Sequence, residues 1–213
     1  GRAADDRLFK KGSYLMRTMS QIRGFLFDLD GVITDTARLH AQAWQAIARE
    51  VEAPWTPALA ASLKGIDRMQ SLALIIAAAP HPKTYSQEEK EALATAKNTR
   101  YLELVAGLTP TDIEPGIRMF LDSLQRHGYQ IALASSSKNA PTVLEHLGLA
   151  ELFPKIVDPA TLKHGKSAPE IYQQAAALLN LDPAQCLGVE DAASGVASIN
   201  AAGATAIGIG DAA

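Results

Sequence analysis

Two acidic residues follow a short apolar segment near the start of the chain. Phe25-Leu26-Phe27 has the composition of a buried strand, and Asp28 and Asp30 come directly after it. Functional groups in open α/β sheets gather at the carboxyl ends of the strands, and carboxylates sharing a small volume need a cation to stay ionised. Magnesium is the usual ion where an all-oxygen site also handles phosphate, so the pair predicts a magnesium site.

Two simpler interpretations of this acidic pair remain. A helix-loop-helix calcium site needs further oxygen ligands at alternating positions and a late glutamate, which Val32 and Ile33 after Gly31 do not supply. A solvated acidic turn is commoner in general, but it gives no reason for a buried apolar strand to precede the pair. The metal-site interpretation is therefore preferred.

Predicted helices and strands alternate from Ile113 onward. This alternation, with short connections, is typical of a parallel sheet covered on both faces, and it brings the ends of the strands to one edge. The predicted strands are 130–134, 155–157, 186–189 and 205–209, and the predicted helices are 116–127, 140–147, 169–179 and 192–202. The polar groups at that edge are Asp28 to Asp30, Ser135 to Ser137, Asp158, Glu190 and Asp191, with Lys166 opening the third of these helices.

A helical segment is inserted between the first strand and this alternating region. Apolar residues at helical spacing predict helices at 37–51, 58–63, 68–79 and 86–105, and Ser86 with Glu89 forms a capping box. We therefore expect a core domain of residues 19–35 and 109–213, and a helical domain of residues 36–108. Residues 1–18 read as a tag or disordered extension, with Met19 as a plausible native start.

The composition excludes several classes of protein. The chain has 213 residues, of which 47% are hydrophobic, a net charge of −3 and a pI near 6.0. These values give no basic footprint for nucleic acid or an anionic membrane, and the longest apolar run, 72–79, is too short to span a bilayer. A single cysteine, Cys186, excludes an internal disulfide framework and is consistent with the cytoplasm. Nothing in the sequence demands more than a monomer.

The segment from Phe27 to Thr36, with the sequence FDLDGVITDT, resembles the first motif of the haloacid dehalogenase superfamily. Further matches extend from about Ile22 over nearly the whole chain, and they are most similar to the β-phosphoglucomutase branch of its phosphotransferases. The resemblance implies a Rossmann-like parallel sheet core with an inserted helical cap domain. Relatives usually continue through a last strand and helix, which leaves open whether the native chain continues past Ala213.

The resemblance also implies roles for residues of the core. Asp28 would be the nucleophile that takes the phosphoryl group, and Asp30 the general acid and base. Mg²⁺ would be held by the Asp28 carboxylate, the Asp30 main-chain carbonyl and Asp191, with Glu190 beside or within that shell. The Ser135 hydroxyl and the adjacent N–H of Ser136 would hold phosphate oxygens. Lys166 would face the phosphoryl group, although Ser167 stands where relatives usually have proline.

A second group of implied residues binds the sugar phosphate. Without the resemblance, each of them would be interpreted as a solvated charge, a turn or a helix position. Thr36 and His40 would lie at the hinge, with His40 coupling substrate binding to the general acid and base. The implied contacts to the sugar or its distal phosphate are Lys64, Gly65, Arg68, Lys97 and Asn139.

Together these features predict a magnesium-dependent mutase that interconverts β-D-glucose 1-phosphate and glucose 6-phosphate through the 1,6-bisphosphate. A sugar-phosphate phosphatase of the same superfamily is the alternative enzyme, and it would need Asp28, Asp30, Ser135, Lys166 and Asp191 but not the cap set. A non-catalytic sugar-phosphate-binding module is the alternative outside enzymes. The expected partner is a small sugar phosphate, with no nucleic acid or membrane, and its identity is not fixed by the sequence.

Overall fold

The computed structural model describes residues 19–64 and 66–210, so the expectations for 1–18 and for Gly65 lie outside the described residues. The chain divides into two compact units. The first contains the described residues up to Thr34 and those from Thr109 onward, and the second is Asp35–Leu108.

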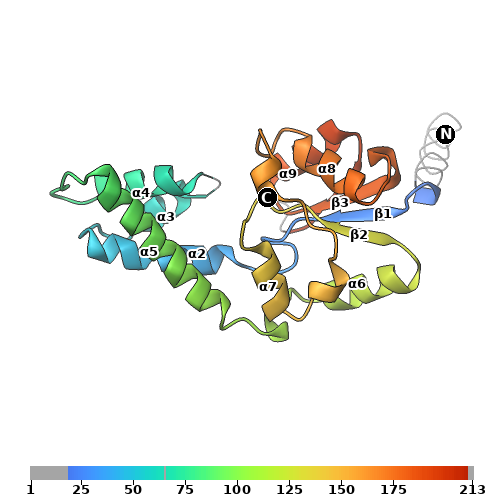
Figure 1. Cartoon of the computed structure of the whole chain (residues 1–213), viewed down its shortest axis with the longest axis horizontal. Helices are drawn as coiled ribbons and strands as arrows, with labels where there is room; N and C mark the ends of the chain where they lie inside the picture. The colour runs from blue at the N-terminus through green and yellow to red at the C-terminus, as the bar shows by residue number, and fades with distance from the viewer. Residues whose placement is uncertain (1–18, 65, 211–213) are drawn as a thin grey trace, which may run out of the picture. The chain divides into compact units, whose positions relative to one another are not determined.

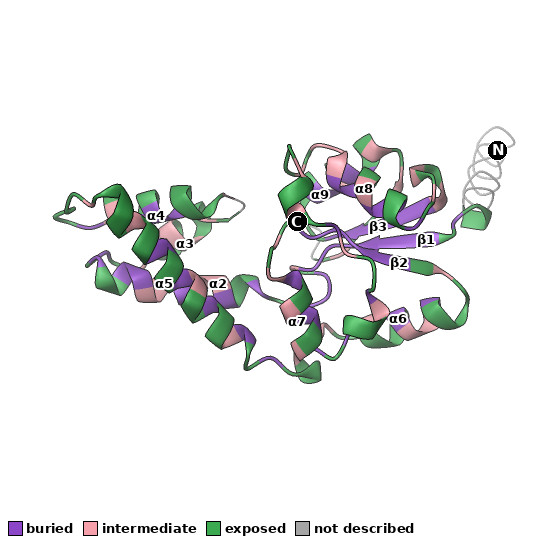
Figure 2. Ribbon diagram, in the orientation of Figure 1, coloured by how far each residue is buried: buried purple, intermediate pink, exposed green. Residues whose placement is uncertain are grey.

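A four-stranded parallel sheet forms the centre of the first unit, with the order β2-β1-β3-β4 (Figure 1). β1 pairs with β2 and β3 along its whole length, with Phe27 opposite Leu133 and Val189. All residues of β1 and β3 are buried (Figure 2), as expected for central strands of a parallel sheet. The strands are β1 Gly24–Phe27, β2 Gln130–Leu133, β3 Cys186–Glu190 and β4 Thr205–Gly208.

Helices cover both faces of this sheet, with α8 and α9 on one face and α6 and α7 on the other (Figure 1). Because side chains alternate along a strand, Leu26 packs with Ile171 and Ile199 from α8 and α9. Phe25 and Phe27 point to the other face, where both rings contact Phe120 of α6 edge-on. The helices are α6 Ile117–Arg126, α7 Ala140–His146, α8 Glu170–Leu178 and α9 Ala193–Ala202.

The strand predicted at 155–157 is reduced to a single bridge, between Leu133 and Ile156. Leu133 N–H donates to Lys155, and Val157 N–H donates to Leu133, so only one residue pair is formed. The segment then ends because the Asp158 side chain caps the following short turn by accepting a hydrogen bond from the N–H of Ala160. Asp158 is therefore a capping residue in this structure.

The described residues of the second unit form four helices. Its interior is built from α2, α4 and α5, which contribute Trp44, Ile47, Leu72, Ile75 and Leu93 among its buried apolar residues. The capping box predicted at Ser86 and Glu89 is confirmed. The helices are α2 Ala37–Glu50, α3 Pro57–Ser62, α4 Arg68–Ala77 and α5 Gln87–Val105.

The two chain segments on either side of the insert are joined inside the first unit. Thr34 forms an antiparallel bridge with Ile113, and its hydroxyl donates to the Asp112 carbonyl at 2.6 Å.

Among the residues described, no helix has both the length and the apolar character needed to cross a bilayer.

Candidate active site

Asp28 lies one residue beyond β1, at the carboxyl edge of the sheet. Its N–H donates to the Val189 carbonyl at 3.1 Å, which continues the pairing of β1 with β3 and fixes the main chain at this point. The Asp28 side chain is nearly buried, with the residue 9% exposed. Its Oδ1 lies 3.0 Å from the ammonium of Lys166. The first predicted carboxylate and the predicted lysine are therefore in direct contact, although 138 positions separate them in the sequence.

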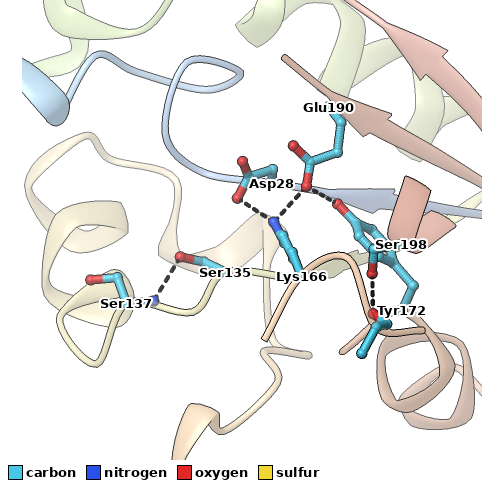
Figure 3. A network of polar contacts seen from close by, with 8 residues as sticks. Asp28, Ser135, Ser137, Lys166, Tyr172, Glu190 and Ser198 are labelled. Carbon is cyan, nitrogen blue, oxygen red and sulfur yellow. Dashed lines mark hydrogen bonds and ion pairs between the residues drawn. The ribbon is translucent and has the colours of Figure 1, made fainter. Parts of the chain in front are cut away.

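Lys166 also contacts Glu190, the last residue of β3 (Figure 3). Its Nζ donates to Glu190 Oε1 at 2.5 Å, and the Tyr172 hydroxyl donates to the same oxygen at 2.5 Å. The second oxygen, Oε2, is buried and has no hydrogen-bond partner among the described residues. A buried carboxylate oxygen without a donor is costly, and a cation beside it would remove that cost.

Three carboxylates gather where β1 and β3 end. Asp28, Glu190 and Asp191 each offer an oxygen, and these oxygens all lie within 4.8 Å of one another. Carboxylate oxygens are the ligands that hard divalent cations such as Mg²⁺ prefer, so this donor set fits such an ion. The structure thus brings together three residues of the predicted metal shell. Asp30, which was expected to contribute its main-chain carbonyl, is not among these three side chains.

Glycines make room for two of these carboxylates. Gly31 has φ +73°, and a Cβ there would overlap the Asp191 carboxylate. Gly195, in the first turn of α9, makes room for Glu190 in the same way: a Cβ there would overlap the carbon and both oxygens of its carboxylate. The glycine positions therefore allow main chain and carboxylate to meet, which a larger residue would prevent.

Burial and repulsion raise the pKa of two of these carboxylates, Asp28 and Asp191. Burial, together with Glu190, raises the pKa of Asp28 to about 7, although Lys166 opposes the shift. Burial and Glu190 likewise raise the pKa of Asp191. Burial alone would lower the pKa of Lys166, but Asp28 and Glu190 beside it raise it above the ordinary value. Lys166 is therefore a permanent cation at neutral pH, whereas Asp28 would need further positive charge to be fully ionised.

The serine loop after β2 is held by its own hydrogen bonds. Ser135 is buried, and its hydroxyl accepts from the N–H of Ser137 at 3.1 Å, while the Ser137 hydroxyl accepts from the N–H of Asn139 at 3.2 Å. Ser136 is exposed, and Asn139 is half-buried directly before α7. The structure places Ser135 two residues beyond the end of β2, near Asp28 and Lys166 (Figure 3).

In the second unit, His40 and Lys97 form a buried pair. Lys97 is 5% exposed, and its Nζ lies 2.8 Å from His40 Nδ1. Because an ammonium can only donate, Nδ1 must accept, and the ring proton sits on Nε2. The His40 ring stacks on Tyr101 at 4.0 Å between centroids, and Lys97 also lies 5.0 Å from the Trp44 centroid. Burial, then Lys97, lowers the pKa of His40 to about 3, so the ring stays neutral.

Other predicted residues of the second unit differ in their surroundings. Arg68 begins α4 and donates to Asn98 Oδ1 of α5 at 3.3 Å. Its charge also lowers the pKa of His40, by less than burial and Lys97 do. Lys64 is exposed and Thr36 is buried at the start of α2. Arg68, Lys97 and His40 are therefore close together.

Sequence reasoning missed Tyr172, Gly195 and Asn98. Tyr172 lies on the buried face of α8 among apolar residues, so its position alone predicts only a core aromatic. Gly195 in a predicted helix would have been a detectable anomaly, because glycine is unfavourable in helices unless close packing requires it. Asn98 follows Lys97 in a polar helix and carries no signal of its own.

The chain is similar to known proteins over most of its length. The model of a hydrolase family, haloacid dehalogenase-like hydrolase, matches residues 22–203. The β-phosphoglucomutase of Bacillus subtilis is 43% identical over 189 residues, which cover 89% of this chain and 84% of that protein. The crystal structure of β-phosphoglucomutase from Clostridium difficile has a TM-score of 0.79 and 42% identity, covering 89% of this chain and 85% of the other.

Phosphatases are also among the relatives, at lower identity. A phosphorylated carbohydrates phosphatase of Thermotoga maritima is 29% identical, covering 84% of this chain and 80% of that protein. The fold, the family model and the two more similar proteins agree on one assignment. The chain belongs to the haloacid dehalogenase-like hydrolases and, within them, to the β-phosphoglucomutase family.

Proposed function

We propose that this protein is a magnesium-dependent β-phosphoglucomutase, which interconverts β-D-glucose 1-phosphate and D-glucose 6-phosphate. The observation that carries the proposal is the contact of Asp28 with Lys166 inside the group of three carboxylates at the end of the sheet. This arrangement, in a chain 43% identical to the Bacillus subtilis enzyme, supports phosphoryl transfer to and from Asp28.

The divalent cation would be held by Asp28, Glu190 and Asp191, with the main-chain carbonyl of Asp30 as a further ligand. When bound, Mg²⁺ supplies positive charge that offsets the repulsion between carboxylate and phosphate. The buried Oε2 of Glu190, without a hydrogen-bond partner among the described residues, supports this placement.

Asp28 would act as the nucleophile. One of its oxygens forms a bond to phosphorus while the bond from phosphorus to the sugar oxygen breaks, which yields an aspartyl phosphate and divides one hard transfer into two easier ones. Asp30 would give its proton to the departing sugar oxygen and take a proton from the incoming hydroxyl in the reverse step. Lys166 would stabilise the negative charge on the transferring group, and Ser135 with the N–H of Ser136 would bind its oxygens.

A mutase must also bind the phosphate that does not react, because the 1,6-bisphosphate has to rebind in two orientations. We propose that the second unit acts as the cap domain and supplies these contacts, with Asn139 as a further contact from the core. Its clustered cations, Arg68 and Lys97, suit a phosphate, and neutral His40 offers an N–H from Nε2. The remaining proposed contacts are Thr36, Lys64 and Gly65.

The test follows two products in one tube. The enzyme is given β-glucose 1-phosphate, Mg²⁺ and a trace of the 1,6-bisphosphate, and glucose 6-phosphate and inorganic phosphate are measured together. The proposal expects glucose 6-phosphate far in excess of phosphate, and loss of both products in Asp28→Asn, which keeps the shape of the side chain.

The two alternative functions give different results in this assay. Phosphate release in excess of glucose 6-phosphate would favour the phosphatase that lower-identity relatives suggest. Tight binding of the sugar phosphate without turnover, unchanged in Asp28→Asn, would favour a binding module. We further propose that the enzyme is a cytoplasmic monomer, as its metabolite substrate suggests, and light scattering would test the monomer.

A further inference from the structure

Tyr172 contacts both charged partners of the core network, Glu190 and Lys166. It lies in the first turn of α8 and is fully buried. Its hydroxyl donates to Glu190 Oε1 at 2.5 Å, and its ring centroid lies 5.4 Å from the ammonium of Lys166. The ring and the hydroxyl therefore act on different groups, and a substitution can separate them.

The hydrogen bonds on Glu190 are asymmetric. Oε1 accepts from both Lys166 and Tyr172, whereas Oε2 is buried and accepts from no described residue. In Figure 3, Oε1 faces Lys166 and Tyr172, and Oε2 lies on the side of Asp28. A half-turn of the carboxylate would exchange the two oxygens but would leave the same pattern, with one oxygen bonded twice and the other without a donor. A tilt of the whole group, in contrast, would break two charge-assisted hydrogen bonds at once.

Lys166 alone is a weak anchor for Glu190. Its ammonium is already divided between Glu190 Oε1 and Asp28 Oδ1, and it sits on a flexible four-carbon stem. The proposed phosphoryl group on Asp28 would add a further acceptor. Tyr172 has a single proton with a single acceptor, and its ring is fixed among Ile171, Ala175 and other buried residues. The hydroxyl is thus the donor that holds Glu190 independently of Lys166.

We propose that Tyr172 is a positioning residue for the divalent cation: its hydroxyl holds Glu190 so that the second carboxylate oxygen faces Asp28 and Asp191. The inference rests on the metal site of the proposed function, and it adds a residue that contacts neither the cation nor the substrate. Partners that orient a metal ligand typically change metal affinity about 10- to 100-fold when they are removed.

The experiment measures Mg²⁺ binding by isothermal titration calorimetry on the full chain, without sugar phosphate. Tyr172→Phe keeps the ring under Lys166 and removes only the hydroxyl. We expect it to bind Mg²⁺ at least about 10-fold more weakly than the wild type. Ser198→Ala is the matched control, because it also removes a buried hydroxyl, one that donates to the Ala168 carbonyl at 2.5 Å. The control should bind Mg²⁺ within about twofold of the wild type.

Steady-state kinetics give a readout that general loosening of the fold would not produce. In Tyr172→Phe, the Mg²⁺ concentration for half-maximal rate should rise about 10-fold, while kcat at saturating Mg²⁺ stays within about threefold. A double-variant cycle adds a measurement that does not depend on the stability of one variant. The effect of Tyr172→Phe on Mg²⁺ binding should become small when Glu190→Gln is already present, since the hydroxyl acts through that carboxylate.

Four outcomes would overturn the inference. They are Mg²⁺ binding unchanged in Tyr172→Phe, equal weakening in the Ser198→Ala control, an undiminished effect in the presence of Glu190→Gln, and a wild type that does not bind Mg²⁺. Because the calorimetry uses the metal alone, a failure of the proposed mutase activity would leave the first three measurements intact. The two proposals are therefore tested separately.

Discussion

Replacing Gly195 by alanine would test the geometry around Glu190, because two physical effects predict opposite results. Gly195 lies inside α9, where alanine is ordinarily favoured over glycine by about 1 kcal/mol. On helix propensity alone, Gly195→Ala should stabilise the protein. In the structure, however, the new methyl group would overlap the whole carboxylate of Glu190.

The cost of that overlap depends on whether Glu190 can move. Its residue is 1% exposed, and Lys166 and Tyr172 each hold Oε1 at 2.5 Å. Inserting a methyl group into a packed interior costs roughly 1–3 kcal/mol. Breaking a hydrogen bond to a buried charge costs about 1.5–3 kcal/mol. Against the gain in helix propensity, we expect a net loss of roughly 1.5–5 kcal/mol in the free energy of unfolding.

Urea unfolding of the metal-free protein measures the loss in stability, and calorimetry with Mg²⁺ measures the displacement of Glu190. We expect Gly195→Ala to unfold at lower urea and to bind Mg²⁺ at least about 10-fold more weakly. Gly208→Ala in β4 is the control, because a Cβ there meets no atom within 4 Å and needs no unusual φ. A Gly195→Ala protein as stable as the wild type, with unchanged Mg²⁺ binding, would refute the reasoning.

Three further predictions follow from individual contacts. The pKa of Asp28 is raised to about 7, and a cation binds only the ionised carboxylate. Mg²⁺ affinity measured by calorimetry should therefore rise about tenfold per pH unit up to pH 7 and then level off. A flat affinity profile from pH 5 to 8 would contradict this. Lys97→Met should raise the pKa of His40 by roughly one pH unit, yet leave it below 6.5 because burial and the charge of Arg68 remain. NMR titration of the ring would show this, and an unchanged pKa would mean that Lys97 does not contribute to the shift. Thr34→Val removes the hydroxyl that donates to the Asp112 carbonyl. It should lower the free energy of unfolding in urea by about 1–2 kcal/mol, with no effect on Mg²⁺ binding. A variant as stable as the wild type would show that this hydrogen bond contributes nothing to stability.

Much of the fold was predictable because hydrophobic periodicity is a local property of the sequence. The apolar run at Phe25 to Phe27 and the alternation after Ile113 gave the parallel sheet, and Ser86 with Glu89 gave the start of α5. The segment 155–157 shows the limit, since so short a run has no local signal for how many residue pairs it will form.

The site was predictable only where a residue type was itself informative. Acidic residues at strand ends pointed to Asp28, Glu190 and Asp191, which the structure brings within 4.8 Å of one another. Tyr172 could not be found in this way, because its hydroxyl matters only through a carboxylate 18 positions later and its ring fits an ordinary core position. Contacts of this kind depend on the angle at which α8 packs on the sheet, which no local pattern encodes.

The central place of β1 in the sheet affects how the chain folds during synthesis. Its two partners begin only at Gln130 and Cys186, so roughly 100 residues must be made before the first pairing can form. Because synthesis adds about 5–20 residues per second, the apolar strand stays unpaired, in water or bound to a chaperone, for about 5–20 seconds. The helical unit Asp35–Leu108, whose contacts are closer in sequence, is complete by then. We therefore expect the inserted helical unit to fold first. The sheet, whose strands lie on both sides of the insert in the sequence, is expected to form last.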